Sequence, residues 1–235
     1  MRTRFSDGTF RYLGNEAFNL LPPNVVIRAA AVSSGEFNQY SDLLNSNVDI
    51  PVVFEKTDGT RYEFTIRLFK HPSGAGTITI ATQSTGSDGR VTHTPTKEGY
   101  ALATDGTLLL NTDEARGIAG FLFTDYFTEE THNLEGYENF HCTTLEEGDY
   151  YFLVVGGKWN AYSDNSPTVG RAFIGSTTAG QISMAGDFDT SSVAALSTSL
   201  RNNNPGPRNF FCGTFLSAPG AAGLADVWIV LPPKH

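Results

Sequence analysis

Cysteine is scarce: the chain has two among 235 residues. So few thiols exclude a scaffold held by disulfides, and the fold must depend on an apolar core, which a chain of this length is able to bury. No run of about 18 apolar residues occurs, so the sequence predicts no membrane span. The opening residues, MRTRFSDGTFRYLG, are followed by no apolar stretch. They therefore predict no secretory signal. We expect a protein that stays in the compartment where it is made, or joins an assembly there.

Positive charge is also in short supply, with 16 Lys and Arg against 25 Asp and Glu and a net charge of −9. This balance argues against nucleic-acid binding, which requires cations to replace counterions on phosphates. Residues 1–30, however, carry four arginines and two acids, a net +2, so the rest of the chain carries −11. We expect a basic aromatic arm that docks on another protein, or alternatively a solvated, partly ordered terminus. The candidate interface residues in this arm are Arg2, Arg4, Phe5, Phe10, Arg11 and Tyr12.

Helix signals are few and hairpin signals are many. Asp-Gly recurs in SDGT (6–9), TDGT (57–60), SDGR (87–90) and TDGT (104–107). Asp-Gly between apolar runs favours a tight hairpin turn, because both central residues tolerate positive φ. Hairpins are predicted over residues 51–70, 100–110 and 149–162, the last turning at Gly156-Gly157. The second arm of the first hairpin alternates apolar and polar residues, which predicts one buried and one wet face.

Short strands are predicted at 172–174 and 227–231, and short helices over 33–44 and 190–202. The sequence therefore predicts a mainly β chain, built as one or two packed antiparallel β-sandwich units with one or two short helices. A polar, turn-rich stretch near residue 95 suggests an N-terminal arm and hairpin unit over 1–95 and a second β domain over 96–235.

Both cysteines lie in similar hexapeptides, NFHCTT (139–144) and NFFCGT (209–214). In a strand, each Phe-x-Cys pair shares one face, which is typical of a core strand with a buried thiol. A disulfide between Cys142 and Cys212 is the alternative, and it would be expected only in an oxidising compartment.

The sequence predicts no metal site and no cofactor. His141 and Cys142 are adjacent, so a strand turns them to opposite faces, and His132 adds no recognised spacing. The oxygen-rich segments around Asp187 and Asp189, and YSDNSPT (162–168), are typical of solvated turns, although Asp-x-Asp is able to hold a divalent cation.

The sequence also predicts no catalytic residues. Gly175-Ser176 lacks the nucleophile-elbow frame. The acidic pairs Glu129-Glu130 and Glu146-Glu147 are sequence neighbours that diverge in direction, unlike the carboxyl pairs of glycosidases.

The tryptophans complete the list of candidate interface residues. Trp159 and Tyr162 are predicted either to form an exposed platform for a sugar or a partner, or to cap the core, which is the commoner place for a strand tryptophan. Trp228 is expected inside the domain or at a subunit interface.

Two segments together resemble a known family. EGDYYFLVVGGKWNAYSDNSPTVGRAFIG (147–175) is followed, after an insertion over 176–208, by CGTFLSAPGAAGLADVWIVLP (212–232). This order of a Glu-Gly turn, strands, a glycine turn and a closing run of alternating valines resembles the capsid decoration (cement) proteins of tailed bacteriophages. The resemblance covers residues 97–235; residues 1–96 have no counterpart in the small decoration proteins.

The resemblance implies a β-tulip domain and a mechanical function. A decoration protein of this kind is a homotrimer on the capsid exterior, assembled in the host cytoplasm, which binds the major capsid protein and stabilises the shell. The resemblance thus implies a non-enzymatic virion protein without nucleic-acid or membrane partners. A carbohydrate- or cell-surface-binding β-sandwich module, or another head or tail structural protein, is the alternative.

Overall fold

The computed structural model describes residues 2–4, 10–12, 26–27, 49–55, 59–89, 91–110, 117–123, 144–185 and 212–231. Within these residues every regular element is a strand, and most pairings are antiparallel. The predicted mainly β, antiparallel fold is therefore confirmed. The two predicted helices, at 33–44 and 190–202, lie outside the described residues.

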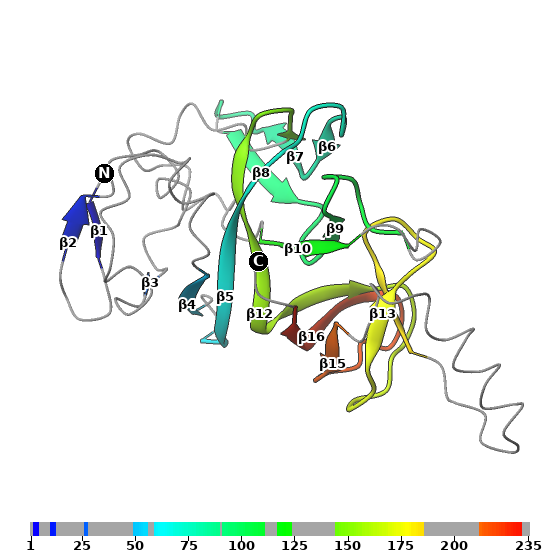
Figure 1. Ribbon diagram of the computed structural model, residues 1–235. Coiled ribbons are helices and arrows are strands. Elements are labelled where there is room, and N and C mark those ends of the chain that lie inside the picture. The colour runs from blue at the N-terminus through cyan, green and yellow to red at the C-terminus, as the bar shows by residue number, and fades with distance from the viewer. Residues whose placement is uncertain are drawn as a thin grey trace, which may run out of the picture. The chain divides into compact units, whose positions relative to one another are not determined.

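The chain divides into two compact units, neither of them one continuous segment. The first unit takes residues 1–98, 122–155 and 232–235, and the second takes 99–121 and 156–231. The strands of the first unit are β1 (Arg2–Arg4), β2 (Phe10–Tyr12), β3 (Val26–Ile27), β4 (Ile50–Glu55), β5 (Arg61–Lys70), β6 (Ile78–Thr79), β7 (Ala81–Thr85), β8 (Val91–Pro95) and β11 (Thr144–Leu145) (Figure 1). The strands of the second unit are β9 (Ala101–Ala103), β10 (Ile118–Leu122, of which the last residue belongs to the first unit), β13 (Phe173–Gly175), β14 (Ile182–Met184), β15 (Gly213–Phe215) and β16 (Gly223–Val230). Strand β12 (Tyr150–Ser163) contributes residues to both units.

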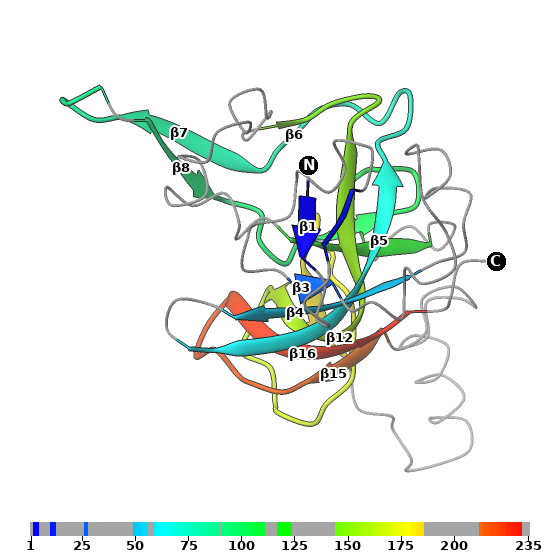
Figure 2. The ribbon, with the colours of Figure 1, turned by 90° about the vertical axis from the view of Figure 1, so that its left-hand side faces the viewer.

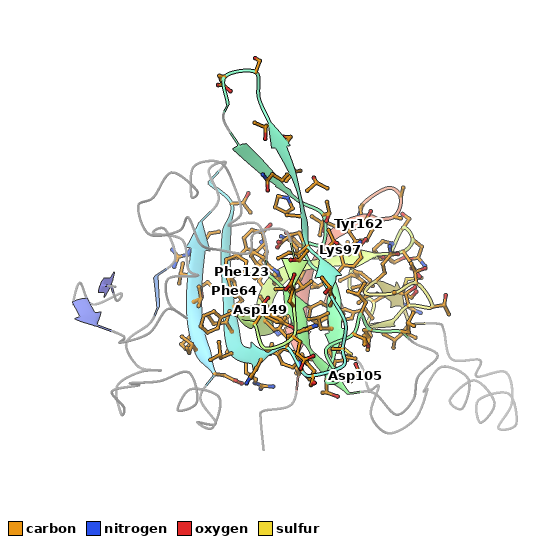
Figure 3. All side chains as sticks on the ribbon, turned by 90° about the horizontal axis from the view of Figure 1, so that it is seen from above. Phe64, Lys97, Asp105, Phe123, Asp149 and Tyr162 are labelled. Atoms are coloured by element: carbon orange, nitrogen blue, oxygen red, sulfur yellow. The ribbon has the colours of Figure 1, made fainter. Side chains whose placement is uncertain are left out.

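The main sheet of the first unit has the order β12-β5-β4-β3. Strands β4 and β5 form the hairpin that the sequence predicts over residues 51–70. Strand β5 also alternates as predicted, and its buried side chains are Tyr62, Phe64, Ile66 and Leu68. Phe64 meets Phe123 edge-on, with ring centroids 5.4 Å apart (Figure 3). The period of two thus places one face of this hairpin in the core.

Strands β7 and β8 form a separate two-stranded ribbon that extends away from β4 and β5 (Figure 2). Its turn contains Gly89 at φ +80°, and the other two described Asp-Gly glycines, Gly59 and Gly106, take φ +82° and +81°. The remaining Asp-Gly, at residues 7–8, lies outside the described residues, between the paired strands β1 and β2. The prediction of Asp-Gly turns is confirmed where the structure describes them, because glycine reaches positive φ without a steric cost.

The sheet of the second unit is built on the ladder between β12 and β16, which runs antiparallel from Gly156↔Val230 to Ser163↔Gly223. Strand β15 adds to the other edge of β16, and β14 pairs with β13. Three aromatic rings fill the core beneath. The centroid of Phe173 lies 6.0 Å from that of Phe121 and 5.6 Å from that of Phe215, and all three side chains are fully buried. These edge-to-face contacts favour one packing arrangement.

The prediction of a hairpin that turns at Gly156-Gly157 is wrong. Strand β12 continues through both glycines, and β16 pairs with each of them, as Gly156↔Val230 and Gly157↔Ile229. Gly157 takes φ +86°, so its backbone is irregular but does not reverse the chain. A glycine in a strand commonly marks such an irregularity. Because β16 pairs with both glycines, the chain continues as a strand instead of turning.

The other predicted strands are confirmed with shifted ends. The segment predicted at 172–174 is β13, which begins one residue later, and the closing strand is β16, which begins earlier than the predicted residue 227. In the predicted 100–110 hairpin, the amide of Leu109 donates to the carbonyl of Ala101 at 2.9 Å. The Asp105 carboxylate accepts from the Thr107 amide at 3.1 Å and from its hydroxyl at 2.7 Å, which closes the turn.

Gly213, at the start of β15, stands where only glycine fits. Its φ is +152°, and a Cβ built there would lie 1.9 Å from the backbone oxygen of Trp228 and 2.7 Å from the Phe173 ring. The backbone oxygen of Trp228 cannot move aside as the end of a flexible side chain can. Strand β15 therefore approaches β16 this closely only because residue 213 has no side chain.

We expect Gly213→Ala to lower the free energy of unfolding by about 1–3 kcal/mol, because the added methyl must displace β15 from β16. Gly220→Ala is the matched control, since a Cβ at Gly220 meets nothing within 4 Å. It should change stability by no more than about 0.5 kcal/mol. Urea unfolding of both variants measures the difference, and equal stabilities would contradict the close approach.

Candidate interaction surface

Strand β16 presents apolar side chains on both of its faces. Ala225, Val227 and Ile229 point into the core and are almost fully buried. The residues between them lie on the opposite face, where Leu224 is 43% exposed, Trp228 51% and Val230 59%. A large aromatic side chain left half exposed between two other exposed apolar residues is unusual for a surface that contacts only water.

Polar side chains border Trp228 on the neighbouring strands. Lys158 of β12 and Thr214 of β15 are its partners in the two ladders, so both lie beside Trp228 on the same face. The ammonium of Lys158 lies 3.5 Å from the carboxylate of Asp226, two residues before Trp228. We use the name Trp228 face for the set Lys158, Thr214, Leu224, Asp226, Trp228 and Val230.

Backbone contacts fix this face in position. The amides of Leu216 and Ser217 both donate to the carbonyl of Asp226, and the Ser217 hydroxyl accepts from the Asp226 amide at 2.7 Å. The amide of Val230 donates to the carbonyl of Cys212 at 2.8 Å. Strands β12 and β15 also pair with β16 on its two sides, so ladder hydrogen bonds fix the position of the central strand of this face.

Trp159 and Tyr162 do not form one platform. Trp159 pairs with Val227 and is 0% exposed, so its ring belongs to the core. Tyr162 pairs with Leu224 on the face of the sheet opposite to Trp159, and its ring centroid lies 5.0 Å from that of Tyr100. Residues three apart on a strand point to opposite sides, which separates the two candidates. The sequence offered a signal for Trp228 instead: Asp226 marks the wet face of GLADVWIV, and Trp228 shares that face.

The N-terminal arm contains two paired strands. Strands β1 and β2 pair antiparallel, with Arg2 opposite Tyr12, Thr3 opposite Arg11 and Arg4 opposite Phe10. Phe5 lies outside the described residues. Five of the six predicted arm residues are therefore brought onto one two-stranded ribbon, whose role in binding stays a prediction.

The oxygen-rich segment 162–168 is tied into the fold by Asp164. One oxygen of the Asp164 carboxylate accepts hydrogen bonds from the hydroxyls of Ser176 and Ser183. Ser176, the serine of the Gly-Ser pair, is itself fully buried and accepts from the Thr178 amide at 3.0 Å. Asp164 thus joins the end of β12 to β13 and β14, and Ser176 has a structural partner.

His71 is another buried polar group with its partners in the fold. Its Nε2 lies 2.7 Å from the carbonyl of Gly76, and its Nδ1 lies 2.9 Å from the Tyr151 hydroxyl. A carbonyl only accepts, so Nε2 carries the proton, and Tyr151 donates to Nδ1. Burial, together with the charge of Asp149, raises the pKa of Tyr151 above its ordinary value, which keeps the phenol protonated as this donor.

Cys212 is a buried free thiol immediately before β15, and it is 3% exposed. Burial raises the pKa of this thiol from 9.0 to about 12. The prediction of a buried, reduced cysteine is confirmed for this residue, while Cys142 lies outside the described residues.

The part of the chain that the structure describes holds no group of three or more His, Cys, Asp or Glu side chains arranged to bind a metal ion. The segments considered for metal binding at His132, His141 and Asp187–Asp189 lie outside it. Among the same described residues, no helix is long and apolar enough to cross a membrane.

No protein-family model matches the chain, and no curated protein sequence matches it. Among solved structures, the N-terminal base of the head fibre protein gp8.5 of bacteriophage phi29 aligns with 72% of this chain and 98% of its own length, at 9% sequence identity and a TM-score of 0.30. The chain is thus weakly similar to a phage head protein.

In a Cys142→Ala variant, we expect Cys212 to react with a thiol reagent roughly a thousandfold more slowly in the native protein than in urea. Burial blocks access, and the raised pKa lowers the thiolate fraction by about that factor. The absorbance of the released thiol measures both rates. Prompt labelling of the native protein would contradict the buried position.

Alkaline pH should destabilise the fold. The folded chain keeps the Cys212 proton up to about pH 12, whereas the unfolded chain releases it from about pH 9. A pKa that folding raises contributes stability that is complete below the unfolded value, so stability falls between these limits, by roughly 1 kcal/mol per pH unit for one proton. Urea unfolding at several pH values measures the slope. Cys212→Ala should show a shallower decline, and an unchanged slope would exclude Cys212 as its source.

Proposed function

We propose that the chain is a non-enzymatic structural protein of a bacteriophage virion, and more closely a capsid decoration protein that binds the outer shell and stabilises it. The sequence resemblance over residues 147–175 and 212–232 supports this function. The segments that carry the resemblance form β12, β13, β15 and β16, which belong to one sheet. The observation that carries the proposal is the Trp228 face, because a row of exposed apolar side chains on a rigid strand indicates a protein that assembles with others.

The charge distribution fits this function. A body of net −11 keeps many copies soluble at the high local concentration of a shell, because like charges repel. The N-terminal arm, with Arg2, Arg4 and Arg11, is the part whose charge is complementary to an acidic surface. In this proposal the arm binds the major capsid protein, copies of the chain associate as a homotrimer, and the protein lies on the capsid exterior.

Carbohydrate binding is the second candidate. The observation in its favour is again Trp228, a half-exposed aromatic ring beside Lys158, Asp226 and Thr214, because an indole ring stacks on a sugar and polar neighbours bind its hydroxyls. The platform that the sequence predicts for Trp159 and Tyr162 gives no such support, because Trp159 is buried.

Co-sedimentation tests the proposed function. Phage heads assembled from the major capsid protein, but lacking this chain, are mixed with the purified chain and pelleted. We expect saturable binding that weakens with salt, because surface charge attraction is screened. A chain that ignores heads and binds a glycan array would contradict the proposal.

The arm is tested in the same assay. Replacing Arg2, Arg4 and Arg11 by alanine, or deleting residues 1–14, should weaken binding to heads at least about tenfold. Arg61→Ala is the matched control, since Arg61 is an exposed arginine of the first unit, with 58% of its side chain accessible. Unchanged binding by the deletion variant would exclude the arm as the anchor.

A further inference from the structure

We propose that the Trp228 face is the contact surface between copies of this chain, and that Trp228 lies next to the symmetry axis of the assembly. This deepens the proposed function by naming the surface through which copies associate. It rests on that function only for the expectation that copies associate, and it requires no shell. All six residues of the face come from three paired strands of the second unit, so one rigid sheet presents them together.

The apolar part of the face has the anatomy of an interface centre. Trp228, 51% exposed, stands between Leu224 and Val230 on the same side of one strand. Tryptophan is enriched among the residues that dominate binding energy, because it buries a large area and loses few rotamers. Lys158 and Thr214 on the flanking strands supply a polar rim around it.

The charges of the face identify a second copy as the occupant. Lys158 and Asp226 contribute one charge of each sign, 3.5 Å apart, so the face is neutral on a chain of net charge −9. Two copies repel each other over most of their surfaces, and a neutral face reduces that repulsion. Symmetry then places Lys158 of one copy beside Asp226 of the next copy around the axis, so the face is complementary to itself.

The existing contact between Lys158 and Asp226 does not prevent this. An ion pair at the surface of one chain is worth little, because water screens both groups. The carboxylate accepts several hydrogen bonds and the ammonium donates three, so each group is able to keep its neighbour and add one from the next copy. At the edge of a dry tryptophan contact, the added pairs are screened less and specify how the copies are oriented.

The first experiment measures the mass of the full chain in solution by light scattering and sedimentation equilibrium. We expect a concentration-dependent oligomer for the natural chain, and association weakened about 30-fold or more by Trp228→Glu. Val169→Glu is the control, because Val169 is 56% exposed and lies outside the face. Trp228→Phe, which keeps an aromatic ring, should retain part of the association, and thermal unfolding verifies that each variant is folded.

The second experiment uses charge reversal, which leaves the apolar residues in place. Lys158→Glu gives the face two negative charges and Asp226→Lys gives it two positive charges, so each variant alone should be monomeric. An equimolar mixture should recover association as mixed pairs, because each copy of one variant then meets an oppositely charged face of the other. Reversing the exposed pair Arg61 and Glu63, whose side chains are 3.0 Å apart, is the matched control and should change neither result.

The outcomes separate this inference from the proposed function. A natural chain that stays monomeric at high concentration, folded Trp228→Glu that associates normally, or charge variants that fail to associate when mixed would overturn the inference. A monomer that still pellets with phage heads would overturn it while leaving the decoration function in place. Association through this face without any binding to heads would leave the inference standing and contradict the decoration function. Binding of a glycan at Trp228 in a monomer would identify a sugar as the occupant instead.

Discussion

The alternation of side chains along the ladder of β12 with β16 determines the rest of the second unit. The ladder buries Trp159, Val227 and Ile229 on one side, where the aromatic core around Phe173 covers them. A strand with a period of two that turns Val227 and Ile229 inward must turn Trp228 outward. The exposed tryptophan is therefore a consequence of how the core is filled, and shifting the register by one residue would exchange the two faces.

A close approach of β15 to β16 holds Trp228 in this position. Gly213 lets β15 lie against the backbone of Trp228, and Ser217 binds the amide of Asp226. These contacts hold the strand on the side away from β12. A surface fixed in this way loses little conformational entropy when it binds, which suits a protein whose proposed function is to assemble with others.

Buried and half-buried polar groups serve the fold, including Asp164 in the oxygen-rich segment 162–168 and Ser176 in the Gly-Ser pair. Asp164 accepts from two serine hydroxyls, and His71 lies between a carbonyl and a phenol. Each of these contacts joins segments that are distant in sequence, and together they account for side chains that would otherwise suggest an acid, a base or a nucleophile. The candidate function consequently depends on a surface, and none of the described polar clusters is needed to explain it.

The sequence by itself determined the local structure. Asp-Gly pairs located the turns, because glycine reaches positive φ cheaply, and the alternation over residues 61–70 identified the buried face of β5. The buried thiol of Cys212 also followed from a Phe-x-Cys pattern. These features depend on neighbours within a few residues, which a sequence displays directly.

The tertiary structure decided what depends on distant partners. Gly156-Gly157 is compatible with a turn or with a continuous strand, and the pairing of both glycines with β16 selected the strand. For the same reason, Trp159 entered the core while Trp228, its diagonal neighbour across the ladder, remained outside. Which face of a strand is covered depends on the elements that pack against it, and these come from far along the chain.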